Sequence, residues 1–138
     1  MKNFCYLFIF LFLSTLKLAA QPENTDTLVV VKAKSKSHFG IASYYADKFE
    51  GRKTASGEIY YGNKLSAACN ILPLGTLIRV TNLRNKKRVI VKVNDRLHPQ
   101  NKRIVDMSKS AAEMLGYARK GLTEVKVEVL TKASLKVE

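Results

Sequence analysis

Short runs of β-branched residues, each bounded by turn residues, restrict this chain to a fold built from short strands. Residues 77–81 and 88–93 are two such runs, and the polar segment 85–87 between them predicts a hairpin turn. In residues 125–129, valine alternates with lysine and glutamate. That alternation predicts a strand with one buried face and one solvated face.

Two more strands and one helix complete the regular elements that the sequence predicts. Residues 40–45 and the pair Ile104-Val105 have the composition of strands. Residues 109–115 predict a helix, because Ser108 is a good N-cap and Gly116 stands where a helix ends. The apolar stripe of this helix consists of Ala111, Ala112, Met114 and Leu115. Several short strands with one small helix predict a mainly β fold, either a compact barrel or a sandwich.

The first twenty residues have the three parts of a secretory signal peptide. Lys2 supplies the positive charge, and residues 4–13 form an unbroken apolar run. Small residues follow at Ala19 and Ala20, and we expect cleavage after Ala20. A retained membrane anchor is the alternative. A span needs about 20 apolar residues, however, and Lys17 interrupts the end of this run.

The two cysteines bear on export and on stability. Cys5 lies inside the leader rather than at the cleavage point, so we do not expect a lipid anchor. Removal of the leader leaves Cys69 alone, and a single cysteine cannot form an internal disulfide. The remaining chain of about 118 residues suffices for one domain, which its core alone must stabilise.

The chain is strongly basic. Its formal net charge is +13, and removal of Lys2 and Lys17 with the leader leaves +11. Such a charge attracts polyanions. For an exported protein these are cell-wall polymers and anionic lipids, so we expect no nucleic-acid partner. A solvated, lysine-rich surface with no polyanionic partner is the alternative.

Three carboxylates stand in irregular segments, where functional residues are more common than in core strands. Glu58 follows the small-residue turn 54–57, and its simpler interpretation is an ordinary surface turn residue. Asp95 ends a strong strand, a position suited to acid or base chemistry on a glycosidic bond. An ion pair with Arg96 is the alternative for Asp95. For Asp106 we prefer a role in capping the following helix over a catalytic one.

Metal and cofactor chemistry is not expected. His38, His98 and Cys69 do not have the spacing of a conventional zinc site.

Eight short stretches, in this order, carry a family resemblance. They are Gly40-Ile41-Ala42-Ser43-Tyr44-Tyr45, Thr54-Ala55-Ser56-Gly57-Glu58, Ala67-Ala68, Leu72-Pro73-Leu74-Gly75-Thr76, Val80-Thr81-Asn82-Leu83, Val93-Asn94-Asp95-Arg96, Arg103-Ile104-Val105-Asp106-Met107-Ser108 and Ala111-Ala112-Glu113-Met114-Leu115-Gly116. Together they make residues 40–130 resemble the rare lipoprotein A family, the septal-ring lytic transglycosylases with a double-psi β-barrel.

The resemblance implies a six-stranded double-psi β-barrel with one or two short helices and a glycan-binding groove. We expect the barrel domain at residues 38–131, after a signal peptide at 1–20. Residues 21–37 would be a polar, basic linker or an extra strand, and residues 132–138 a tail. In that family the enzyme cleaves bare peptidoglycan strands without water and leaves 1,6-anhydro-N-acetylmuramic acid ends.

The resemblance also implies which residues act. The family's catalytic positions fall on Asp95, as the general acid and base, and on Glu58, which would support charge or substrate position. We expect the substrate to be bound by Tyr45, Thr54, Ser56, Asn94, Arg96 and His98.

Three departures from the family pattern qualify this expectation. Cys69 stands where the family has a histidine, and a thiol cannot replace an imidazole as partner of a carboxylate. Leu97-His98 replaces the usual Gly-Pro after the Asn-Asp-Arg motif. We hypothesise that His98 takes over part of the missing histidine's role; an exposed loop histidine is the alternative. The chain also stops at Glu138, where typical members continue into a glycan-binding repeat, so septal targeting is not carried over.

The sequence thus leaves three functional hypotheses. The first is a lytic transglycosylase that acts on peptidoglycan glycan strands. The second is a non-catalytic, expansin-like module that binds cell-wall glycan, and the third is an inhibitor-like protein on the same scaffold. In each case we expect a monomer exported to the periplasm or cell envelope, without a stable membrane anchor after signal cleavage.

Overall fold

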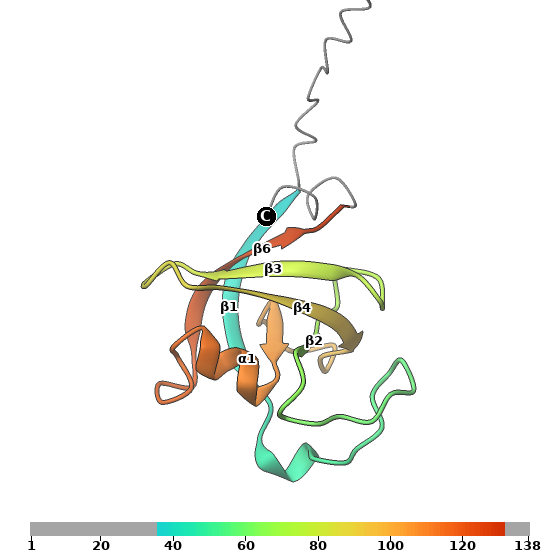
Figure 1. Ribbon diagram of the computed structural model, residues 1–138. Helices are drawn as coiled ribbons and strands as arrows, with labels where there is room; N and C mark the ends of the chain where they lie inside the picture. Colours follow the sequence, from blue (N-terminus) through green and yellow to red (C-terminus); the bar gives the residue numbers. More distant parts are fainter. Residues whose placement is uncertain (1–35, 132–138) are drawn as a thin grey trace, which may run out of the picture. The chain divides into compact units, whose positions relative to one another are not determined.

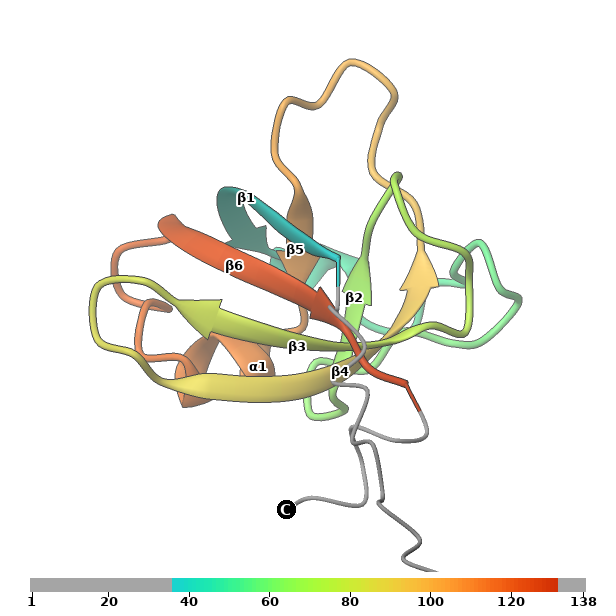
Figure 2. The ribbon, with the colours of Figure 1, turned by 90° about the horizontal axis from the view of Figure 1, so that it is seen from above.

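A computed structural model describes residues 36–131 of the chain. The predicted signal peptide, nearly all of the segment 21–37 and the tail 132–138 lie outside the described residues. Six strands close into a barrel in the order β1-β5-β2-β4-β3-β6 (Figures 1 and 2). The mainly β class, the six strands and the barrel predicted from the sequence are therefore confirmed. No helix within residues 36–131 has the length and apolar character needed to cross a membrane.

The elements follow one another in a fixed order along the chain. They are β1 (Ser37–Tyr44), the 3-10 turn η1 (Asp47–Phe49), β2 (Ser66–Ala68), β3 (Leu77–Asn82), β4 (Arg88–Asp95), β5 (Val105–Met107), α1 (Lys109–Met114) and β6 (Thr123–Val129). β3 and β4 form the predicted antiparallel hairpin, and its turn places Lys86 at a φ of 64°. β5 begins at Val105, one residue later than predicted.

Alternation along the strands places the core inside the barrel. The buried side chains of β3 and β6, and those of β4 as far as Val93, are spaced two residues apart, as the pleat requires. The largest fully buried apolar side chains are Tyr117, Ile78, Met107, Leu115, Val80, Val91, Val93, Val105, Val125, Val127 and Cys69. This core holds a barrel in which β1–β5 and β2–β4 are the parallel pairs.

The predicted helix and its N-cap residue Ser108 are confirmed, but two of its side chains differ from expectation. Met114 is exposed, because the short α1 turns only Ala111, Ala112 and the following Leu115 into the core. Ser108 holds the N-cap position, but its hydroxyl accepts a 3.4 Å hydrogen bond from the N–H of Ser66 in β2 instead of capping α1. The Ser108 side chain therefore ties α1 to the sheet.

Candidate functional site

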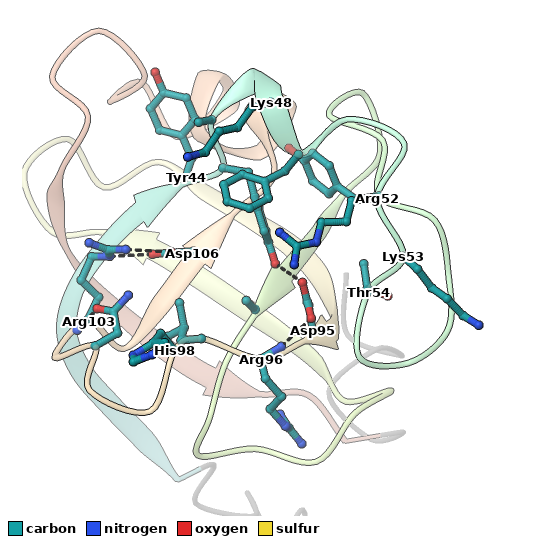
Figure 3. Close-up of a pocket in the computed structure, with 17 residues that line it drawn as sticks. Tyr44, Lys48, Arg52, Lys53, Thr54, Asp95, Arg96, His98, Arg103 and Asp106 are labelled. Carbon is teal, nitrogen blue, oxygen red and sulfur yellow. Dashed lines mark hydrogen bonds and ion pairs between the residues drawn. The ribbon is translucent and has the colours of Figure 1, made fainter.

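An open cavity of about 720 Å³ lies at one end of the barrel, bounded by loops (Figure 3). Its walls come from the end of β1, from η1 and the loop after it, from the end of β4, from the 96–103 loop and from β5. Its lining includes Tyr45, Lys48, Phe49, Arg52, Thr54, Tyr60, Asp95, Arg96, His98, Arg103 and Asp106. A hollow of this size falls in the ordinary range for ligand sites.

A β-bulge places Asp95 in this cavity. Ala67 in β2 pairs with Val93, but the next residue, Ala68, pairs with Asp95, so Asn94 is the extra residue in β4. A bulge breaks the strict alternation of side chains and re-aims the residues beside it. The Asn94 side chain points to Glu58, while Asp95 lines the cavity.

Three donors orient the Asp95 carboxylate. Its Oδ1 accepts hydrogen bonds from the backbone N–H groups of Ala55 and Arg96, both at 2.8 Å. Its Oδ2 accepts a 2.6 Å hydrogen bond from the hydroxyl of Tyr45. A carboxylate offers about two acceptor positions on each oxygen, so Oδ1 is filled. Among the residues described, Tyr45 is the single donor to Oδ2, which leaves that oxygen as the one able to exchange a proton with a ligand.

The Tyr45 ring is fixed by aromatic packing. It stacks at a tilt on Tyr60 with ring centroids 4.5 Å apart, and it makes a T-shaped contact with Phe49 with ring centroids 5.7 Å apart. Burial, and then the hydrogen bond to Asp95, raises the pKa of the Tyr45 hydroxyl far above its ordinary value. The hydroxyl therefore stays protonated and remains a donor to Asp95 at any physiological pH.

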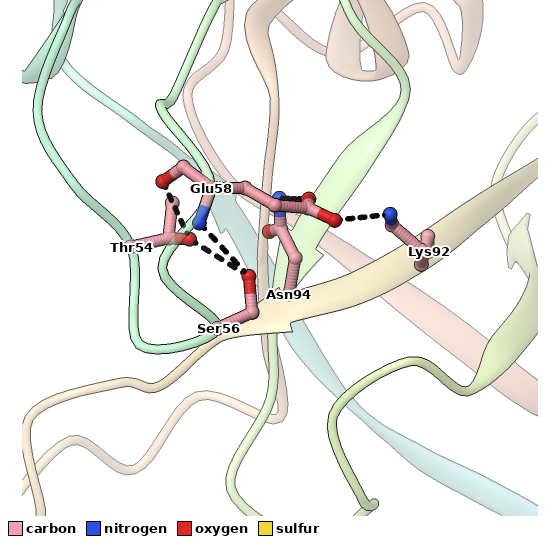
Figure 4. Close-up of polar contacts among 5 residues, drawn as sticks. All are labelled: Thr54, Ser56, Glu58, Lys92 and Asn94. Atoms are coloured by element: carbon pink, nitrogen blue, oxygen red, sulfur yellow. Dashed lines mark hydrogen bonds and ion pairs between the residues drawn. The ribbon is translucent and has the colours of Figure 1, made fainter.

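Glu58 occupies a different environment (Figure 4). It ends a turn in which the Thr54 hydroxyl donates to the Glu58 carbonyl at 2.9 Å and Gly57 takes a φ of 89°, a value that suits glycine. Its carboxylate forms an ion pair with Lys92 and accepts a 2.9 Å hydrogen bond from the Asn94 amide. These two contacts, Lys92 first, lower the pKa of the Glu58 carboxyl. Glu58 is thus held as an anion on the outside of the barrel wall.

The other predicted site residues divide between the two carboxylates. Tyr45, Thr54, Arg96 and His98 line the cavity with Asp95, whereas Ser56 and Asn94 lie with Glu58 outside the lining. The Arg96 guanidinium donates to the carbonyl oxygens of Cys69 and Leu72, so it braces the loop that follows β2. The alternative interpretation of Arg96 as an ion-pair partner of Asp95 is therefore wrong.

At the position where the family has a histidine, this chain has a packed core residue, Cys69. The Cys69 side chain is fully buried, which agrees with the plainer of its two interpretations, an apolar core residue. Only its backbone reaches the site, through an N–H that donates to the carbonyl of Asp95 at 3.0 Å. The exposed His98 lines the cavity, and its Nδ1 accepts a 3.3 Å hydrogen bond from the N–H of Gln100. Within the described part of the chain, the imidazole forms no hydrogen bond or ion pair with Asp95.

Asp106 does not cap the helix, so that prediction is wrong. Both of its oxygens accept from the Arg103 guanidinium, at 2.7 and 2.9 Å. A two-point pair of this kind is geometrically specific, and it holds the Asp106 carboxylate in the cavity wall on β5, away from the N-terminus of α1. No group of three or more His, Cys, Asp or Glu side chains within residues 36–131 is arranged to hold a metal ion.

Sequence reasoning missed the basic and aromatic wall opposite β4. Lys48, Phe49 and Arg52 line the cavity, and the two cations lie 5.4 and 5.5 Å from the centre of the Phe49 ring. The signal that could have found them is the placement of cations beside an aromatic residue in the same irregular segment as Glu58. Such a segment is otherwise read as solvated surface.

Comparison with known proteins gives the cavity a context. Residues 37–127 match the family described as "Lytic transglycolase". The endolytic peptidoglycan transglycosylase RlpA of Haemophilus influenzae is 44% identical over 99 residues, which cover 72% of this chain and 34% of that protein. The RlpA proteins of Pasteurella multocida and Pseudomonas aeruginosa are 50% and 51% identical, over 66% and 64% of this chain and 31% and 26% of their own lengths. This chain therefore spans about a third of these relatives.

Two solved structures share the fold. The Streptomyces papain inhibitor aligns with a TM-score of 0.57 at 20% identity, over 70% of this chain and 96% of its own. An expansin of Clavibacter michiganensis, solved in complex with cellohexaose, aligns with a TM-score of 0.56 at 19% identity, over 70% of this chain and 51% of its own. At these identities the likeness concerns the barrel alone.

Proposed function

This chain belongs to the lytic transglycolase family of double-psi β-barrels, and on that premise we propose that its cavity cleaves peptidoglycan glycan strands. The observation that carries the proposal is the Asp95 carboxylate, partly buried in the cavity and oriented by three donors. The curated relatives are named as endolytic peptidoglycan transglycosylases. Bare glycan strands are the proposed substrate.

The geometry of Asp95 suits one acid and base group better than a pair of carboxylates. In the proposed reaction, protonated Oδ2 gives its proton to the glycosidic oxygen on C1 of N-acetylmuramic acid, and the C1–O bond breaks. The 6-hydroxyl of the same sugar then bonds to C1 and returns its proton to Oδ2. Because the nucleophile belongs to the substrate, no water has to be activated by a second carboxylate. The product end is a 1,6-anhydro sugar.

Glu58 takes a supporting role in this proposal. Its lowered pKa makes it a poor proton donor at neutral pH, and it does not line the cavity. Its contacts with Lys92 and Asn94 hold the turn 54–58, whose Ala55 N–H binds Asp95. Glu58 would thus act on the reaction mainly through the position of that turn, and the sugar contacts of Ser56 and Asn94 would lie along the same edge.

The proposal also includes the setting in which the protein acts. We place it outside the cytoplasmic membrane, exported by the signal peptide and free of a lipid anchor, as a monomer in the periplasm or cell envelope. The support is the form of residues 1–20 and the peptidoglycan named for the relatives.

Mass spectrometry of peptide-free glycan strands after incubation with the mature protein tests the activity. We expect new fragments with 1,6-anhydro ends, and we expect Asp95→Asn to abolish them. Asp95→Asn keeps the shape of the side chain but cannot carry the proton, and its folding is checked by thermal melting. Anhydro fragments formed equally by the variant would contradict the role of Asp95.

A non-catalytic, glycan-binding module is the second candidate. It is favoured by the aromatic cluster of Tyr45, Phe49 and Tyr60 in the cavity, because aromatic faces pack well against sugars. The expansin with the same barrel was solved with cellohexaose bound. Intact strands that nevertheless sediment with the protein would support this candidate over the enzyme.

A further inference from the structure

The cations of the cavity differ in whether the protein already engages them. Arg103 is paired with Asp106, and Arg96 donates to two backbone carbonyls. For the guanidinium of Arg52, by contrast, the described residues provide neither an ion pair nor a hydrogen bond. The ammonium of Lys48 likewise has neither an ion pair nor a hydrogen bond among the described residues. Both groups line the cavity, so both are available to a ligand.

Phe49 holds these two cations in place. The guanidinium carbon of Arg52 lies 5.5 Å from the centre of the Phe49 ring, and Nζ of Lys48 lies 5.4 Å from the same centre. Contacts of this kind are individually weak at exposed sites, but they restrict long side chains. Phe49 itself packs against Tyr45 in a T-shaped contact. Figure 3 shows the Arg52 guanidinium directed into the cavity toward Asp95, whereas Lys53 extends away from it.

The cations Arg52 and Lys48, unpaired among the described residues, indicate that the ligand carries a negative charge. A planar guanidinium with parallel N–H groups matches a carboxylate in a two-point contact. In a peptidoglycan strand, the sugar that carries a carboxyl group is N-acetylmuramic acid, through the lactyl ether on its C3. Asp95 acts at C1 of that sugar in the proposed reaction, so the lactyl group of the same ring lies within reach of the cavity wall opposite Asp95.

We propose that Arg52 forms a carboxylate subsite for the free lactyl group of the muramic acid whose glycosidic bond is broken. The inference rests on the proposed function, because it takes the substrate from it. A stem peptide attached to this carboxyl converts it into a neutral amide and fills the space in front of Arg52. The subsite therefore makes the cavity selective for strands without stem peptides at the cleaved position.

The test compares two forms of the same peptide-free strands, one with free lactyl carboxylates and one with these groups converted to neutral methylamides. We expect the wild-type protein to bind the free form about tenfold more tightly than the methylamide, the usual size of a lost charge-assisted contact. Arg52→Gln should bind both forms with the weaker affinity. In turnover the loss should appear in KM more than in kcat, because the lactyl group is bound equally before and during bond cleavage.

Two further variants serve as controls for Arg52→Gln. Arg119→Gln removes an exposed arginine from the turn after α1, outside the cavity lining, and should behave as wild type. Arg52→Lys keeps the charge but not the two-point geometry and should recover part of the preference. Thermal melting of each variant establishes that it is folded.

Each outcome has a definite meaning. Equal binding of both strand forms by the wild-type protein, or an unchanged preference in Arg52→Gln, would overturn the subsite while leaving the proposed cleavage untouched. A larger effect of Arg52→Gln on strands that retain stem peptides would also overturn it, because the carboxylate bound would then belong to the peptide. A wild-type protein that discriminates in binding yet forms no anhydro ends would retain the subsite and overturn the proposed cleavage.

Discussion

Asp95 and Glu58 are bound to the same short turn, yet the protein surrounds them in opposite ways. Asp95 faces the cavity and accepts hydrogen bonds from a tyrosine hydroxyl and from two backbone N–H groups. One of these N–H groups, that of Ala55, belongs to the turn. Glu58 ends the turn, keeps 44% of its side chain exposed, and is paired with Lys92. Among the described residues, Asp95 accepts hydrogen bonds from neutral donors and forms no ion pair, whereas a cation holds Glu58 as an anion. The first arrangement suits a group that exchanges a proton, and the second suits a structural brace.

The largest expected effect separates the two carboxylates directly. Asp95→Asn should lower turnover of glycan strands by about 10² to 10⁴, the usual contribution of an acid–base group. Glu58→Gln should lower it by less than about tenfold, because an exposed ion pair contributes little and the amide can keep one of the contacts. Rates of formation of anhydro ends measure both. Equal losses in two folded variants would break the comparison and return Glu58 to a direct part in the chemistry.

Tyr45→Phe sharpens the description of the Asp95 side. It removes the hydroxyl that binds Oδ2 and keeps the ring that packs on Phe49 and Tyr60. We expect kcat to fall by about tenfold, since a hydrogen bond to a charged group is lost, while KM stays near its wild-type value. A rise in KM with an unchanged kcat would show instead that the hydroxyl contacts the sugar, as the sequence-based prediction of a substrate-binding role implies.

The barrel could be predicted because its signals are local. The alternation in β6, the hairpin of β3 and β4, and the position of α1 all depend on residues close in sequence. The exposed Met114 shows the limit of this reasoning, because a helix as short as α1 buries only the positions that its neighbours cover. The family resemblance supplied the six-stranded barrel, but the strand order and the parallel pairs rest on contacts far apart in the chain and were not predicted.

The candidate site, too, could be predicted only where its signals are local in the sequence. Asp95 follows from the end of a strand and from the family motif, but its separation from Glu58 depends on one bulge at Asn94. The role of Tyr45 as a donor joins residues 50 positions apart. The hypothesis that His98 replaces the missing histidine rested on nearness in sequence. The structure places the Tyr45 hydroxyl, rather than the imidazole, against the carboxylate.

The smallest expected effect concerns stability on the Glu58 side and its dependence on pH. The pKa of the Glu58 carboxyl is lowered below its ordinary value of 4.5 in the folded protein. A lowered folded-state pKa gives stability that is present above the ordinary value and is lost as the pH falls through the folded-state value. Wild type should therefore melt slightly above Glu58→Gln at pH 7, and the difference should shrink as the pH falls below 4.5. High salt should also reduce it, since both side chains of the pair are more than 40% exposed. A difference that persists unchanged at low pH would mean that Glu58 stabilises the turn by packing and hydrogen bonding rather than by charge, and the contrast with Asp95 would then have to rest on position alone.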